Sequence, residues 1–141
     1  MSLTSWKEEF MPTEACDTSK KEASDHVLRK WIGLREENLR RHGLRRVYAS
    51  IRGKYNDIPY SMSVDCSTCA FCLHYLKPAG VGCGSCPLFK SLGASCDRRD
   101  GGYPARSPYD EFLLDGNPEP MISAILMSRY GITMKQVYAN E

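Results

Sequence analysis

The chain has 141 residues, of which 42% are hydrophobic and 26% are charged, and its formal net charge is +2. This size and composition fit a single globular domain and exclude a collagen-like or fully disordered chain. No apolar run approaches the roughly 18 residues that a transmembrane helix needs, so we expect no membrane partner. The first ten residues hold no apolar stretch behind a basic one, which predicts no signal peptide and a reducing, cytoplasmic compartment.

Basic residues are concentrated in one segment of the chain. Residues 20–54 hold 11 of the 19 Lys and Arg residues against four acidic ones. A local positive field of this kind attracts nucleic acid or an acidic protein, and the alternative is a solvated helix face that the acidic remainder balances. The arginines on either side of Gly43 are the predicted partner-binding residues: Arg40, Arg41, Arg45 and Arg46.

The N-terminal part is predicted to be an arm followed by helices. Residues 1–18 show no periodicity, so we expect a loosely ordered arm before a single domain over residues 19–141. Ser19 and Glu22 have the spacing of a helix-capping pair, and the residues after them place apolar side chains three and four positions apart. The pattern predicts two helical stretches, the second of which ends at Gly43.

A β-hairpin is predicted after these helices. Residues 44–52 and 58–64 alternate between apolar and polar side chains, which is typical of strands. The residues between them, Gly53–Asp57, are turn formers.

Two further helices are predicted near the C-terminus. Ser107 and Pro108 are the residue types favoured at the N-cap and the first helical position, and Gly116 suits the end of the helix. Asn117-Pro118 begins the next helix, which Gly131 closes.

Six of the seven cysteines lie within residues 66–96, and in a reducing compartment such a cluster indicates metal rather than disulfides. Two Cys-x-x-Cys pairs, Cys69 with Cys72 and Cys83 with Cys86, are ten residues apart. Each tight turn brings two sulfurs to one side, and four sulfurs complete the tetrahedral shell of a structural zinc ion. We therefore predict a zinc centre in this segment.

The cluster has more sulfur than one zinc ion requires, which leaves alternatives. Cys66 and Cys96 are either buried thiols, or Cys96 replaces a member of the second pair as the fourth ligand. An iron–sulfur site built on Cys66, Cys69 and Cys72 is less favoured, because the Cys-Pro step that follows in bacterial ferredoxins is displaced here to Cys86-Pro87.

These elements predict a small α+β, zinc-stabilised domain with N-terminal helices, a β-hairpin, two cysteine turns and two C-terminal helices. None of the three histidines falls in a recognisable nucleophile–base motif, and there is no phosphate-binding glycine loop. Catalysis is therefore not indicated, and an enzyme is the third alternative behind two kinds of binding protein.

Several short motifs, taken in their order, resemble a family of small, cysteine-rich phage and prophage proteins. The matching pieces are Lys30-Trp-Ile-Gly-Leu-Arg-Glu-Glu-Asn-Leu39, Arg41-His-Gly-Leu44, Ser67-Thr-Cys-Ala-Phe-Cys72, Cys83-Gly-Ser-Cys-Pro-Leu88, Gly93-Ala-Ser-Cys96, Ser107-Pro-Tyr109 and Asn117-Pro-Glu-Pro-Met-Ile122. The resemblance implies that Cys66 is an addition to a shared pattern of Cys69, Cys72, Cys83, Cys86 and Cys96. It also implies a viral gene in a host-cell cytoplasm, and it carries no known activity.

The function predicted from the sequence is a non-catalytic, zinc-stabilised binding or regulatory module. In the first hypothesis the basic segment contacts nucleic acid, with Tyr48, Tyr55 and Tyr60 available for stacking. In the second, apolar residues dock a host protein that the module binds or inhibits, with Trp6, Phe10 and Trp31 as the anchors. The sequence does not specify an oligomeric state.

Overall fold

The computed structural model describes residues 2–55, 58–65, 68–76, 86–92, 96 and 107–131, which form helices and one antiparallel sheet. The elements in chain order are α1 (Leu3–Phe10), η1 (Ala15–Asp17), α2 (Ala23–Gly33), α3 (Glu36–Arg41), β1 (Arg45–Val47), β2 (Ser50–Tyr55), β3 (Ile58–Ser63), the π-helical segment η3 (Cys72–Leu76), α4 (Pro87–Leu92), α5 (Pro108–Asp115) and α6 (Glu119–Arg129). The mixed α and β class that the sequence predicts is confirmed. Within the described residues, no helix is long and apolar enough to span a membrane.

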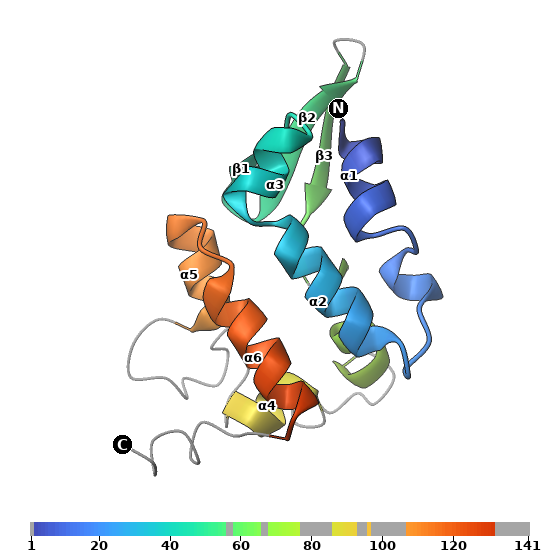
Figure 1. Ribbon diagram of the computed structural model, residues 1–141, viewed down its shortest axis with the longest axis vertical. Helices are drawn as coiled ribbons and strands as arrows, with labels where there is room; N and C mark the ends of the chain where they lie inside the picture. The colour runs from blue at the N-terminus through green and yellow to red at the C-terminus, as the bar shows by residue number, and fades with distance from the viewer. Residues whose placement is uncertain are drawn as a thin grey trace.

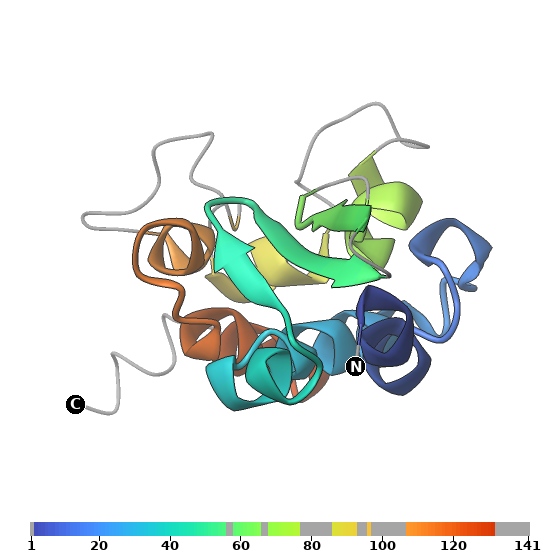
Figure 2. The same cartoon turned by 90° about the horizontal axis from the view of Figure 1, so that it is seen from above.

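Helix α2 is the centre of the fold. It packs against α1 on one side and α6 on the other, and Figure 2 shows these helices in one layer with the sheet lying over them. Figure 1 shows α5 beside α6, while α4 lies at the end of the molecule away from the sheet. The core between the layers contains the fully buried side chains of Trp6, Val27, Leu34, Ile51, Phe112 and Ile125.

Helix α1 occupies the segment for which the sequence predicts a loosely ordered arm. Ser2 and Ser5 cap its first turn reciprocally, and Trp6 is fully buried. The indole Nε1 of Trp6 donates to the carbonyl of Gly33 at 2.8 Å, at the end of α2. A Cβ at Gly33 would lie 2.5 Å from the ring of Phe10, so the absence of a side chain allows α1 to dock. The aromatic pair spaced four residues apart thus holds this helix in place.

The two helical stretches before the sheet are α2 and α3. The hydroxyl of Ser19 accepts from the backbone N–H of Glu22 at 3.2 Å, one residue before α2 begins. Gly43 follows α3 with a φ of 70°, in the left-handed region that favours glycine at a helix end. Both predicted stretches are confirmed.

The sheet contains the predicted hairpin and one further strand. Strands β2 and β3 pair antiparallel, with Ile51 opposite Met62 on the face that packs into the core. The segment predicted as one strand over residues 44–52 is divided into β1 and β2 by a turn at Tyr48, which has a φ of 53°. The alternation of apolar and polar residues did not reveal this turn, because the turn contains neither glycine nor proline.

The C-terminal helices begin where their capping residues predict. Ser107 and Asp110 form a capping box at α5, and Gly116 ends that helix with a φ of 70°. Helix α6 begins at Glu119, directly after Pro118. Residues 132–141 lie outside the described residues.

Candidate metal centre and nucleic-acid interface

The described cysteines of the cluster lie around two short helical segments. Cys69 precedes η3, whose first residue is Cys72, whereas Cys86 directly precedes α4 and Cys96 follows it. Cys69 and Cys86 are buried, and Cys72 and Cys96 are half-buried. Cys66 and Cys83 lie outside the described residues. The described part of the centre therefore contains the first predicted pair, one member of the second pair and the alternative fourth ligand.

The first cysteine pair forms a local thiol–thiol contact. A hydrogen bond from Cys72, together with the charge of Lys30, lowers the pKa of Cys69 to about 6, although burial opposes this shift. The thiolate is the form of cysteine that binds metal ions. These contacts therefore favour the thiolate form of Cys69.

Lys30 of α2 reaches the cysteine cluster from the core, and the sequence reasoning did not single it out. Its Nζ donates to the carbonyl of Thr68 at 3.0 Å and to the Thr68 hydroxyl at 3.4 Å. Burial lowers the pKa of Lys30, whereas the cysteines raise it, Cys69 most and Cys96 among the others. Lys30 is thus a neighbour of Cys69 and Cys72, at the start of η3, and of Cys96, which follows α4 in the sequence.

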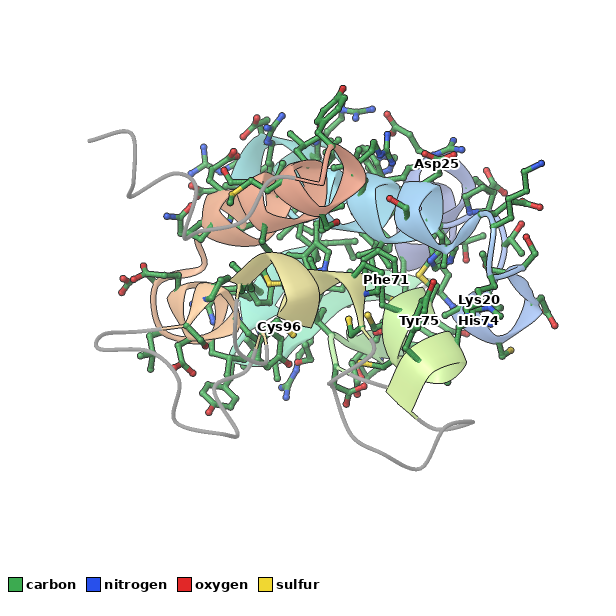
Figure 3. All side chains as sticks on the ribbon, turned by 90° about the horizontal axis from the view of Figure 1, so that it is seen from below. Lys20, Asp25, Phe71, His74, Tyr75 and Cys96 are labelled. Carbon is green, nitrogen blue, oxygen red and sulfur yellow. The ribbon has the colours of Figure 1, made fainter. Side chains whose placement is uncertain are left out.

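The described residues by themselves do not complete a metal shell. No three His, Cys, Asp or Glu side chains among them lie close enough together to hold a metal ion. Figure 3 shows Cys96 beside α4 and, apart from it, His74 with Lys20 and Tyr75 near the start of α2. His74 bonds through Nε2 to the carbonyl of Thr18. The cysteines provide the soft sulfur donors that zinc prefers, and the complete ligand set stays a prediction.

Three of the four predicted partner-binding arginines are engaged within the chain. Arg40 pairs with Glu36 on the same helix at 2.7 Å, and Arg41 binds both carboxylate oxygens of Glu9 at 2.7 and 2.8 Å. Arg46 donates to the carbonyls of Leu113 and Tyr48 at 2.9 and 3.2 Å. Each of these three guanidinium groups therefore has a partner within the protein.

Arg45 differs from the other three, because it belongs to an exposed cationic surface. It lies directly opposite Arg52 in the pairing of β1 with β2, so both side chains point to the same side of the sheet. Lys54 lies two residues after Arg52 and points to that side as well. All three are exposed, and neither Arg45 nor Lys54 has an ion pair within the described residues. We call Arg45, Arg52 and Lys54 the basic face.

The basic face borders an open hollow. The hollow has a volume of about 800 Å³ and is lined by the three cations together with Tyr60 and Ser61, and none of its described lining residues is acidic. Tyr60 is 45% exposed, and it pairs with Gly53, so it points to the other side of the sheet from the three cations. Strands β1 to β3 contain no Asp or Glu at all. The positive charge of this surface is therefore not neutralised by its own strands.

The aromatic residues proposed as docking anchors belong to the core. Trp6, Phe10 and Trp31 are 0%, 7% and 2% exposed. Trp31 packs edge-on against Phe112 with ring centroids 5.0 Å apart. These three side chains cannot present a surface to a partner protein without unfolding the helical layer.

Comparisons of the chain with known families, curated proteins and solved structures found no relative. The chain matches no family model, no curated protein and no solved structure. The resemblance to small phage proteins therefore stays a prediction.

Proposed function

We propose that this protein is a non-catalytic, zinc-stabilised module of phage type that binds the sugar–phosphate backbone of nucleic acid through the basic face. The observation that supports the proposal most directly is the cross-strand pair of Arg45 and Arg52, with Lys54 beside it, on strands without an acidic residue. Like charges directly opposite each other in a sheet destabilise it. A phosphate group bound between them removes that repulsion.

The chemistry of the basic face fits phosphate better than it fits bases. Guanidinium groups bind phosphate through two parallel hydrogen bonds, and an ammonium adds a point charge. No asparagine or glutamine lies on the three strands to read adenine, and an arginine that binds phosphate is not available to read guanine. We therefore expect binding with little dependence on base sequence.

The test is a fluorescence-anisotropy titration at low salt with single-stranded and duplex oligonucleotides. Arg52→Thr and the triple variant R45T/R52T/K54T should bind progressively more weakly, and the loss should be similar for different sequences. Arg52→Thr should also leave the free energy of unfolding unchanged or raise it by up to about 1 kcal/mol, because the like-charge pair is removed.

Arg40→Gln is the matched control, because it removes the same charge from a residue that is already paired with Glu36. If Arg40→Gln weakens binding as much as Arg52→Thr, only the net charge matters and the basic face is not the interface. If the wild-type protein binds no DNA or RNA but binds an acidic polypeptide, the protein-partner alternative replaces the proposal.

We also propose that the cysteine cluster binds one structural zinc ion. The paired spacing of Cys69 and Cys72 and the buried sulfur of Cys86 support this. Elemental analysis of the purified chain should find about one zinc per molecule, and Cys69→Ser should lose it, because binding energy at such sites is largely folding energy. Cys16→Ser is the control, since Cys16 is exposed on η1. Iron, or no metal, in the wild-type protein would contradict the proposal.

A second pair of variants tests which cysteine is the fourth zinc ligand. If the two Cys-x-x-Cys pairs hold the ion, Cys83→Ser should abolish zinc binding and Cys96→Ser should retain it. The reverse result assigns Cys96 to the shell in place of Cys83.

A further inference from the structure

Lys30 is a buried basic side chain that none of the contacts described for the fold explains. It is 1% exposed on α2, and its hydrogen bonds go to the carbonyl and the hydroxyl of Thr68, the residue before Cys69. Both acceptors are neutral. Within the described residues, no carboxylate lies within ion-pair distance of its Nζ.

A buried ammonium requires a nearby negative charge, because the interior solvates an isolated charge poorly. The groups that interact with Lys30 electrostatically are Cys69, Cys72, Asp65 and Cys96. Asp65 is exposed and Cys72 and Cys96 are half-buried, so the buried Cys69 is the neighbour that shares the interior with the ammonium. Thiolates would provide the missing charge.

A zinc centre made of thiolates requires a nearby positive charge in the same way. Four cysteine thiolates around Zn²⁺ carry a net charge of about 2−, which a low-dielectric interior disfavours as it disfavours an isolated ammonium. Placed side by side, the ammonium and the centre stabilise each other. Groups that surround metal ligands in this way tune metal affinity without touching the metal.

We propose that Lys30 is a positioning and charge-balancing residue of the cysteine centre, and that Thr68 holds its ammonium against the thiolates. The inference rests on the proposed zinc ion. It assigns to α2, whose residues are far from the cysteine segment in the sequence, an indirect part in metal binding. The central helix of the fold and the metal centre then depend on each other.

The test compares zinc affinities of full-length variants by competition with a chromophoric chelator. Lys30→Met keeps the length of the side chain and removes its charge, and it should lower zinc affinity by roughly 10- to 100-fold. Lys21→Met makes the same change at an exposed position and should leave the affinity unchanged. In the Co²⁺-loaded Lys30→Met protein, the sulfur-to-cobalt charge-transfer bands should shift, because the thiolates lose a neighbouring cation.

A second measurement uses the wild-type protein, so that it does not depend on the folding of a variant. With ¹⁵N-labelled lysine, the ammonium signal of Lys30 should move when Cd²⁺ replaces Zn²⁺, whereas the signal of Lys21 should not. An unchanged Lys30 signal, or a Lys30→Met protein with wild-type zinc affinity, would overturn the inference while leaving the zinc proposal intact. A wild-type protein that takes up no metal would overturn both.

Discussion

Glu9 links the first helix to the residues that end α3. It accepts two hydrogen bonds from Arg41, and His42 Nε2 lies 2.6 Å from its second oxygen. The other ring nitrogen of His42 lies 2.8 Å from the hydroxyl of Ser5. The hydrogen bonds from Arg41 and His42 lower the pKa of Glu9 to about 2. A partly exposed carboxylate thus joins α1 to the segment that leads into the sheet.

The lowered pKa of Glu9 predicts a pH dependence of stability. The carboxyl has a pKa of 4.5 without these partners, so its contribution is fully present above about pH 4.5 and is lost as the pH falls towards about 2. Glu9→Gln should therefore flatten the pH profile of the unfolding free energy in this range. Urea denaturation between pH 2 and pH 7 measures it.

The control for this prediction is Glu8→Gln, the same substitution at the exposed neighbouring position. It should retain the pH profile of the wild-type protein. If Glu9→Gln and Glu8→Gln behave alike, the contact of Glu9 with Arg41 and His42 does not contribute to acid stability.

Individual functional residues were only partly predictable from the sequence. The Cys-x-x-Cys spacing is visible in the sequence, so the candidate metal ligands could be named without a structure. The partners of Arg40, Arg41 and Arg46 depend on which carboxylates and carbonyls the fold brings near them, and spacing does not determine this. The basic face could have been found from the alternation of residues 50–54. This alternation places Arg52 and Lys54 on one face of the strand and the apolar Ile51 on the other face. For Lys30 the sequence holds no comparable signal.

Docking of α1 on the end of α2 depends on one close approach. A methyl group at Gly33 would overlap the ring of Phe10, which is itself buried. Gly33→Ala should therefore destabilise the protein by about 1–3 kcal/mol, although alanine is the better helix former by about 1 kcal/mol. Thermal or urea unfolding measures the change.

A double-mutant cycle separates this overlap from other effects. Phe10→Ala removes the Cγ and Cδ2 atoms that the new methyl group would meet, so the cost of Gly33→Ala should be smaller in the Phe10→Ala background. Equal costs in both backgrounds would show that α1 and α2 do not meet at this point.

Elements with explicit end signals were predicted well. Ser107, Pro108 and Gly116 mark α5 in the sequence, because capping and left-handed positions select particular residue types. Helix α1 was missed, because its eight residues gain stability mainly from the burial of Trp6 and Phe10 rather than from a long periodic pattern. The division of β1 from β2 was missed for a related reason, since Tyr48 is not a residue that usually marks a turn.

Charge in the whole molecule is distributed differently from charge along the sequence. The basic segment over residues 20–54 is partly neutralised by acidic residues from elsewhere, since Arg41 pairs with Glu9 and Arg35 with Glu119. Asp25, one of the few acidic residues in that segment, pairs with Arg129 of α6. Of the cations that stay exposed, Arg45, Arg52 and Lys54 lie together on the outer side of the sheet. Lys20 and Lys21 are also exposed and lie before α2. Part of the sequence asymmetry is thus concentrated on the basic face.

The salt dependence of nucleic-acid binding tests the proposed role of the basic face most directly. Each phosphate contact that is lost should reduce the slope of log Kd against log salt by about 0.7 to 0.9. The slope for the triple variant R45T/R52T/K54T should therefore be smaller than that of the wild-type protein by about two to three. Equal slopes for the two proteins, or no binding by the wild-type protein at low salt, would contradict the assignment of this surface to nucleic acid.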